Sequence, residues 1–324
     1  MKKTWIFTLI MCVCSVVAFS QTQGKIQTKI ANVSVTEIAR KAALTAAERN
    51  DLTALKKVVE EHKQAAYVSD ADGMTPLMFA SQNGNKNMVA YLLNKGAEIN
   101  TEREYPSVRY PEVNALFFAL KYPSLTSFML QKGATVTRSV MMKALDSHQP
   151  TTMMLIEALG TKGVREANNK ETGNSYLWRA AIEGNAGAAT RLLHLGAALE
   201  PYADLAHSPM HRASDSAYKQ FSSKGVKGTV LAVFANYKGL TVSQANHLLE
   251  AIVETASEQH SEGTAAEFAL EATKMVVEKF YALHPEEEQH QLLRWKDSEG
   301  YTAQKFADEN GFSDVAAYLK SAKK

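Results

Sequence analysis

The stretch DGMTPLMFASQNGNKNMVAYLLNKGAEIN, residues 72–100, decides the fold of this 324-residue chain. An Asp-Gly pair opens it with a tight turn, because glycine tolerates positive φ and aspartate bonds to nearby backbone. Thr75 is placed to cap a helix, and Pro76 suits the first helical position, where no N–H is needed. Gly96 is expected to end a second helix in the left-handed conformation. The stretch therefore predicts a short antiparallel helix pair that cannot bury its apolar stripes alone.

The same order of turn, helix start and glycine stop recurs along the chain. Residues 172–199 (TGNSYLWRAAIEGNAGAATRLLHLGAAL) and 297–319 (DSEGYTAQKFADENGFSDVAAYL) repeat it, and weaker copies lie at 45–59, 114–136 and 208–213. Gly73 and Gly173 are 100 residues apart, which is three steps of 33 and one residue more. A period near 33 with a Thr-Pro-Leu-like helix start resembles the ankyrin repeat.

The resemblance implies an all-α fold. We expect an ankyrin-repeat solenoid of about seven to eight stacked helix-turn-helix repeats, which share one continuous core. This domain would span residues 36–324, with its clearest repeats at 72–104, 169–201 and 297–324. The middle is irregular, and residues 240–296 exceed the repeat length, so an enlarged repeat is expected there, followed by a connector at 284–295.

The N-terminal segment is distinct from the repeats. Lys2 and Lys3 precede an apolar run, and Ala18-Phe19-Ser20 offers a cleavage site, which together are typical of a secretory signal peptide over residues 1–20. The alternative is an uncleaved membrane anchor, but the run is shorter than the roughly 20 residues of a spanning helix. Residues 21–35 are polar and predict a tether. We therefore expect an exported protein, periplasmic or secreted.

Cysteine and charge constrain the exported chain. Both cysteines lie in the signal segment, so the remaining chain can form no disulfide. The formal charge of +2 also comes from that segment, which leaves 34 basic and 34 acidic side chains. A neutral chain does not favour nucleic acid or an anionic membrane surface as a partner.

Catalytic and metal motifs are weak. The sequence has no H-E-x-x-H, G-x-S-x-G or phosphate-binding glycine loop. His207 and His211 have an i, i+4 spacing, but the resemblance gives His211 a structural role, ordering the turn by hydrogen bonding. His284 and His290 flank three glutamates in HPEEEQH, which indicates a solvated acidic helix start. We therefore expect no enzyme, no catalytic residue, no cofactor and no metal site.

The resemblance places function on the surface of the turns and first helices. The variable first-helix position, just before a packing alanine, matches Phe79, Phe118, Lys143, Arg179 and Arg212. In the turns, the surface would be extended by Met74, Tyr105, Arg109 and Tyr110. Aromatic and arginine side chains dominate the energetics of protein interfaces. An irregular arrangement could instead bury Phe79 or Phe118 between repeats.

Three hypotheses follow for function. The first is a monomeric, non-catalytic module of the cell envelope that binds a protein partner through this surface. The second is a secreted effector that acts on a host protein. The third is an enzyme or metal-binding protein that uses residues 204–215 or 284–290.

Overall fold

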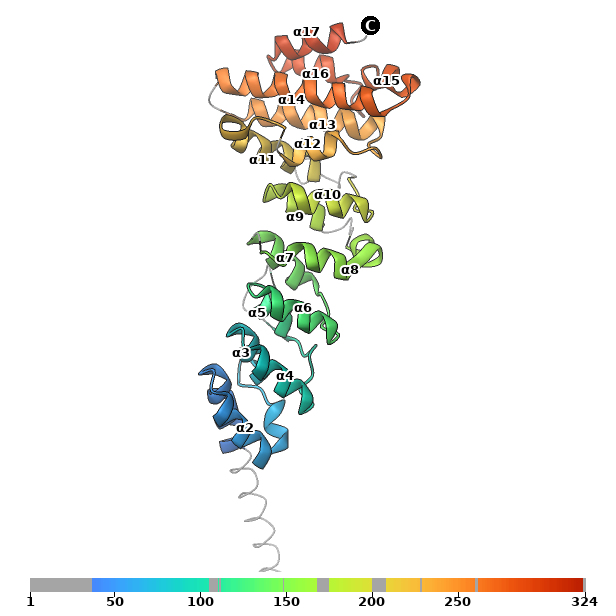
Figure 1. Ribbon diagram of the computed structural model, residues 1–324. Helices are drawn as coiled ribbons and strands as arrows, with labels where there is room; N and C mark the ends of the chain where they lie inside the picture. The colour runs from blue at the N-terminus through green and yellow to red at the C-terminus, as the bar shows by residue number, and fades with distance from the viewer. Residues whose placement is uncertain are drawn as a thin grey trace, which may run out of the picture. The chain divides into compact units, whose positions relative to one another are not determined.

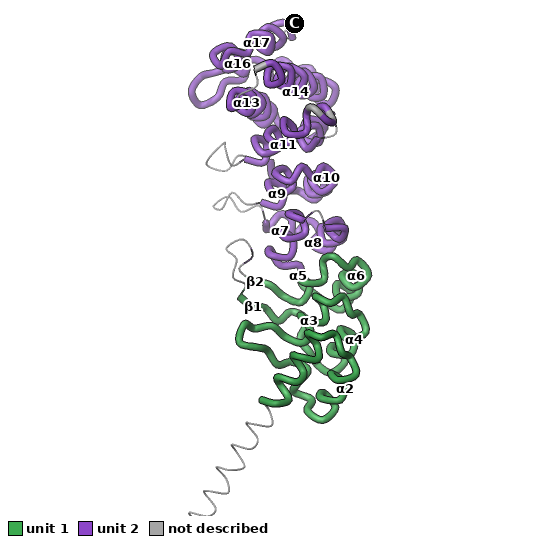
Figure 2. Tube along the Cα trace, turned by 90° about the vertical axis from the view of Figure 1, so that its left-hand side faces the viewer, with its two compact units in different colours: residues 1–106, 112–135 green, residues 107–111, 136–324 purple. Residues whose placement is uncertain are grey.

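The computed structural model describes residues 37–104, 110, 112–147, 149–167, 175–199, 208–227, 229–259 and 262–322. The signal segment and tether expected at residues 1–35 lie outside these ranges. The described chain is almost entirely helical, which confirms the all-α class (Figure 1). It forms two compact units, residues 1–106 with 112–135 and residues 107–111 with 136–324 (Figure 2).

Unit 1 consists of helical hairpins joined by turns. A helix covers residues 37–48. It is followed by α2 (Leu52–Glu61), the 3-10 helix η1 (Lys63–Ala66), α3 (Pro76–Gln82), α4 (Lys86–Asn94), β1 (Arg103–Glu104), β2 (Glu112–Val113), α5 (Ala115–Ala119) and α6 (Pro123–Gln131).

The predicted capping in the 72–100 stretch is confirmed. The Thr75 hydroxyl accepts a hydrogen bond from the Met78 N–H at 3.2 Å, and Pro76 is the first residue of α3. Gly96 has φ of 94°, a conformation in which a side chain would be strained. Leu77 and Ser81, on the face predicted to pack, are buried.

The connection over 101–114 contains an element that its sequence did not indicate. Arg103 pairs with Val113 and Glu104 with Glu112 in a two-stranded antiparallel sheet. Strand pairing satisfies backbone groups that a long turn would leave to water. This connection is therefore a short β-hairpin at its base.

Unit 2 also consists of helical hairpins. Its elements are α7 (Arg138–Asp146), α8 (Thr152–Glu166), α9 (Tyr176–Ile182), α10 (Ala186–His194), α11 (Pro209–Lys224), α12 (Val230–Ala235), α13 (Val242–Ser257), α14 (Glu262–Leu283), α15 (Glu286–Leu292), α16 (Ala303–Glu309) and α17 (Ser313–Ser321). Four of its helices, α8, α11, α13 and α14, have 15 to 22 residues. The first helices α7, α9, α11, α13 and α16 pack in that order, and the second helices α8, α10, α12, α14 and α17 form a parallel row (Figure 1).

The enlarged repeat expected at 240–296 is formed by α13 and α14. Phe268 on α14 is fully buried and packs edge-on against Tyr218 and Phe221 of α11, at 5.3 and 5.5 Å between ring centroids. The predicted connector that follows is itself partly helical, because α15 lies within it. No helix in the described part of the chain is both long and apolar enough to cross a membrane.

Hydrogen bonds across one repeat length tie neighbouring hairpins together. The Asn83 amide donates to the carbonyl of Ala47, 36 residues earlier, at 3.0 Å. The Asn100 amide donates to the carbonyl of Gly133, 33 residues later, also at 3.0 Å. These bonds satisfy backbone carbonyls at helix ends, which otherwise have no partner within the helix.

Candidate functional site

One position recurs on the first helices, the fourth residue after the N-cap, which we call the N-cap+4 position. The N-cap side chains each accept a hydrogen bond from the backbone N–H three residues later: Thr75, Asn114, Ser175, Ser208 and Thr302. The N-cap+4 residues are Phe79, Phe118, Arg179, Arg212 and Phe306, and each precedes a buried alanine. A shared cap and a shared packing residue fix the direction of this side chain.

In unit 1 the N-cap+4 position carries an aromatic pair. Phe79 on α3 and Phe118 on α5 are half-buried, and these two helices pack against each other. Phe118 also meets Phe117 edge-on, with 5.4 Å between ring centroids. Part of each ring is therefore open to solvent, although its base is held in the fold.

The turn before α3 does not provide a contact residue. Met74 is 8% exposed, so its predicted place on the binding surface is wrong. Its backbone N–H donates to the Asp70 carboxylate at 2.7 Å, and its carbonyl accepts from the Asp70 N–H at 3.0 Å. This tight turn draws Met74 into the core. Tyr105 and Arg109, also predicted contacts, lie outside the described residues.

Lys143 and Tyr110 lie together in unit 2. Lys143 Nζ is 5.6 Å from the centre of the Tyr110 ring, and both side chains are half-buried. The Tyr110 hydroxyl donates to the Asp146 carboxylate. Helix α7 is capped by Thr137, so its N-cap+4 residue is the buried Met141 and not Lys143, as the alanine match predicted.

Arg179 is a structural residue. It is 7% exposed and lies between two carboxylates. Its Nε donates to Asp146, and a terminal nitrogen lies 2.9 Å from Glu183. The prediction that Arg179 contacts a partner is wrong, because the neighbouring repeat supplies an acid that holds the guanidinium in the fold.

Arg212 belongs to a charged cluster between α11 and α13. Its guanidinium lies 3.0 Å from one Asp215 oxygen, and the Thr255 hydroxyl donates to the other at 3.2 Å. The Nε of Arg212 is buried without a partner. Arg212 is half-buried, so its outer edge alone is available to a binding partner.

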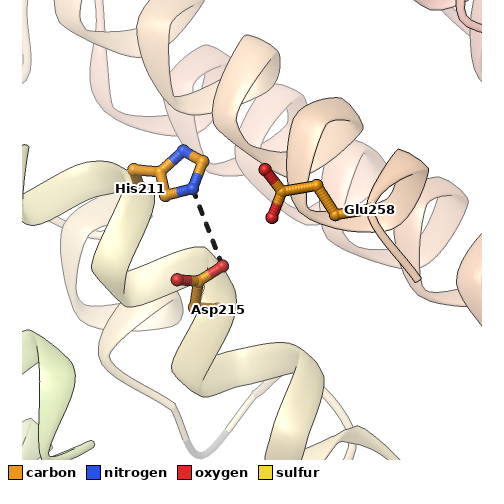
Figure 3. A group of neighbouring side chains, drawn as sticks. All are labelled: His211, Asp215 and Glu258. Atoms are coloured by element: carbon orange, nitrogen blue, oxygen red, sulfur yellow. Dashed lines mark ion pairs between the residues drawn. The ribbon is translucent and has the colours of Figure 1, made fainter. Parts of the chain in front are cut away.

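His211 is buried in the same cluster and contacts α13. Its Nδ1 lies 3.2 Å from a Glu254 oxygen, and its Nε2 lies 3.7 Å from Asp215. The hydrogen bond with Glu254 raises the pKa of His211, and burial opposes this rise. Figure 3 shows Glu258, the C-cap residue of α13, directed toward the same space as His211 and Asp215.

Further along α13 lies a buried acid. Glu250 is 6% exposed, and one of its oxygens has no hydrogen-bond partner. Burial raises the pKa of Glu250 to about 8, and the nearby charges of Asp297 and Glu254 add to this. His247, one turn earlier, packs edge-on against Trp295 at 5.3 Å between ring centroids. Burial lowers the pKa of His247.

The other histidines singled out in the sequence do not form a joint site. His284 stacks on Phe280, and its Nδ1 donates to the Phe280 carbonyl at 2.9 Å. His290 lies 3.6 Å from Glu286 on the exposed side of α15, whose first turn is acidic as predicted. His207 lies outside the described residues.

The α11–α13 cluster is the part of the site that sequence reasoning missed. Asp215 follows His211 by four residues, and Glu254 and Glu258 are spaced in the same way, so each pair can share a helix face. That signal was readable. The packing of α11 against α13 could not be predicted in the same way, because the turns and second helices between them depart from the regular repeat.

Comparison with known proteins identifies the repeats in the N-terminal part. The model for "Ankyrin repeats (3 copies)" matches residues 26–103 and 43–139. No curated protein matches the sequence.

The solved structures that are similar to this chain include the following two. One is described as a predatory endopeptidase, Bd0816, from Bdellovibrio bacteriovorus in complex with immunity protein Bd3460. Its match has 24% identity and a TM-score of 0.44, covering 58% of this chain and 96% of that chain. The other is the human ASB11 ankyrin repeat domain, with 15% identity and a TM-score of 0.43, covering 86% of this chain and 96% of that chain. Both likenesses are too distant to indicate a partner or an activity.

Proposed function

We propose that this chain binds a protein partner through the aromatic pair Phe79 and Phe118, which lies in the part that matches the ankyrin-repeat model. Ankyrin repeats are protein–protein interaction modules and are generally a non-enzymatic scaffold. The observation that supports this choice of surface is the contrast at the N-cap+4 position. Arg179 is bound by carboxylates of its own unit, whereas the two phenylalanine rings remain partly open.

The proposed mechanism is rigid display. Phe79 and Phe118 project from capped helices that pack on each other, so little side-chain freedom remains to be lost on binding. A partner with an apolar cleft would remove the open part of both rings from water. Buried aromatic anchors of this kind commonly cost 2 kcal/mol or more when truncated to alanine.

We place this activity outside the cytoplasm, in the cell envelope. The support is the N-terminal pattern of Lys2-Lys3, an apolar run and Ala18-Phe19-Ser20. Sequencing of the purified protein's N-terminus should begin at Gln21. A chain that starts at Met1 and remains in the cytoplasmic fraction would refute export without affecting the choice of binding surface.

The binding surface is tested by envelope cross-linking with mass spectrometry, followed by affinity measurement on the partner found. The variant Phe79→Ala/Phe118→Ala should weaken binding by at least tenfold. Tyr91→Ala/Phe128→Ala is the matched control, because these half-buried rings lie on the second helices α4 and α6 of the same repeats. An equal loss of affinity in both double variants, or no loss of affinity in Phe79→Ala/Phe118→Ala, would contradict the proposal.

A further inference from the structure

We propose that His211, Asp215 and Glu258 bind a divalent transition-metal cation such as Zn²⁺ at the α11–α13 contact. One ligand atom from each residue lies within 4.8 Å of the other two. The three side chains come from two helices that pack against each other, and they converge on one space (Figure 3). The proposal does not depend on the aromatic surface of unit 1.

The two helices supply the site through the same local spacing. His211 and Asp215 are an i, i+4 pair on α11, and Glu254 on α13 has the same spacing to Glu258, the C-cap residue of that helix. Residues at this spacing lie one above the other on a helix face. The scaffold is therefore helix α11 together with the C-terminal end of α13, and the three ligand atoms already lie within 4.8 Å of one another.

The orientation of His211 is the observation that points to a cation. The ring is 5% exposed, and its Nδ1 lies at hydrogen-bonding distance from Glu254. With the proton on Nδ1, the lone pair of Nε2 is directed toward Asp215, 3.7 Å away. At this separation Nε2 and the Asp215 carboxylate face each other beyond hydrogen-bonding distance. A lone pair that faces carboxylates favours a positive species between them, either a proton or a metal cation.

The contact with Glu254 is the arrangement found around metal-bound histidines. Such a histidine donates its second N–H to a carboxylate or carbonyl, which fixes the tautomer and strengthens the ligand. Glu254 thus acts as a positioning residue for His211. Asp215 is held in place as well, since Arg212 and Thr255 contact its two oxygens.

The ligand types and the charge select the class of ion. One imidazole nitrogen and two carboxylate oxygens suit Zn²⁺ and similar metals, whereas Ca²⁺ takes six to eight oxygen ligands. Among the described side chains of this cluster, three carboxylates (Asp215, Glu254 and Glu258) and one cation (Arg212) leave a negative charge that a divalent ion balances. Glu258 is exposed, so the remaining coordination position opens to water.

The competing occupant of the space is a proton on Nε2. An imidazolium would form ion pairs with Asp215 and Glu254 and would exclude the metal. The two occupants are distinguished by the response to Zn²⁺ near neutral pH and by the role of Glu258, whose exposed carboxylate contributes a metal ligand and is not an ion-pair partner of His211.

The test uses the tag-free exported chain after chelator treatment and dialysis. Titration with Zn²⁺ followed by calorimetry and metal analysis should give one ion per chain, and Co²⁺ should give the visible absorption of a low-coordinate site. Glu258→Gln should weaken Zn²⁺ binding at least tenfold, and His211→Gln should abolish it. Because Glu258 is exposed, its variant is expected to fold normally, which circular dichroism checks.

The matched control is Glu286→Gln. Glu286 forms an i, i+4 pair with His290 at 3.6 Å but belongs to no group of three ligands in the described chain. This variant should bind Zn²⁺ as the parent does. The proposal is overturned if the parent binds no stoichiometric ion up to 100-fold molar excess, or if Glu258→Gln and Glu286→Gln bind equally.

Discussion

Replacing Glu250 by glutamine should make the protein more stable at alkaline pH than the parent. Glu250 is buried on α13, one oxygen lacks a hydrogen-bond partner, and burial raises its pKa to about 8. In the unfolded chain this carboxyl returns to its ordinary value of 4.5. The folded state therefore holds a proton that the unfolded state releases, so stability falls as pH rises from about 4.5 to about 8.

The size of the stability loss follows from the difference between the pKa of Glu250 in the folded and unfolded states. Each pH unit in this window costs about 1.4 kcal/mol of unfolding free energy. Between pH 5 and pH 7.5 the parent should lose roughly 3 kcal/mol through Glu250 alone. Glutamine has nearly the same shape and does not ionise. The nearby carboxylates of Asp297 and Glu254 remain in both proteins, so their own effects largely cancel in the comparison.

Urea unfolding followed by circular dichroism at half-unit steps from pH 5 to pH 9 measures the effect. The stability difference between Glu250→Gln and the parent should grow steadily up to about pH 8 and then level off. For Glu267→Gln, which changes an exposed glutamate of α14, the free energy of unfolding should change with pH as it does in the parent. If Glu250→Gln also runs parallel to the parent, Glu250 is ionised in the fold and the argument from burial is wrong.

Three further predictions concern stability. Arg179→Ala should cost about 3–5 kcal/mol in urea unfolding, because Asp146 stays buried without its cation; a loss below 1 kcal/mol would contradict the structural role. Gly96→Ala should destabilise by about 1 kcal/mol through its φ of 94°, whereas Gly187→Ala, inside α10, should stabilise by about 0.5–1 kcal/mol; thermal melts in which both shift the same way would refute this. Deleting residues 297–324 removes α16 and α17 from α13 and α14, so hydrophobic-dye binding and aggregation should rise. An unchanged melt would show that the preceding helices are self-sufficient.

Most of the fold could be predicted from interactions between residues close together in the sequence. The Thr75 cap and the Gly96 stop depend on residues within one turn, so sequence reading could place them. The burial of Arg179 could not be read in this way, because it depends on Asp146 lying 33 residues earlier at a contacting position. Met74 was misplaced for a different reason, because its local hydrogen bonds to Asp70, four residues earlier, form a turn that was not recognised in the sequence.

The candidate metal cluster likewise combines features that the sequence can predict with one that depends on how the helices pack. The spacing of His211 and Asp215 is visible in the sequence, and so is that of Glu254 and Glu258. Their convergence depends on which helices pack together, and the long α13 and α14 do not follow the period of 33. The spacing could have indicated the two pairs, but that the pairs meet depends on tertiary packing.

The N-cap+4 position also bears on how such a chain can change over evolution. At Phe79 and Phe118 the exposed part of the ring can be altered while the buried alanine beside it keeps the hairpins packed. Replacing Arg179 leaves the buried carboxylate of Asp146 without its cation, so a change at Arg179 must be matched by a change at Asp146. Mutations that change the choice of partner should therefore accumulate in unit 1. At the N-cap+4 position of α9, Arg179 should change only together with Asp146.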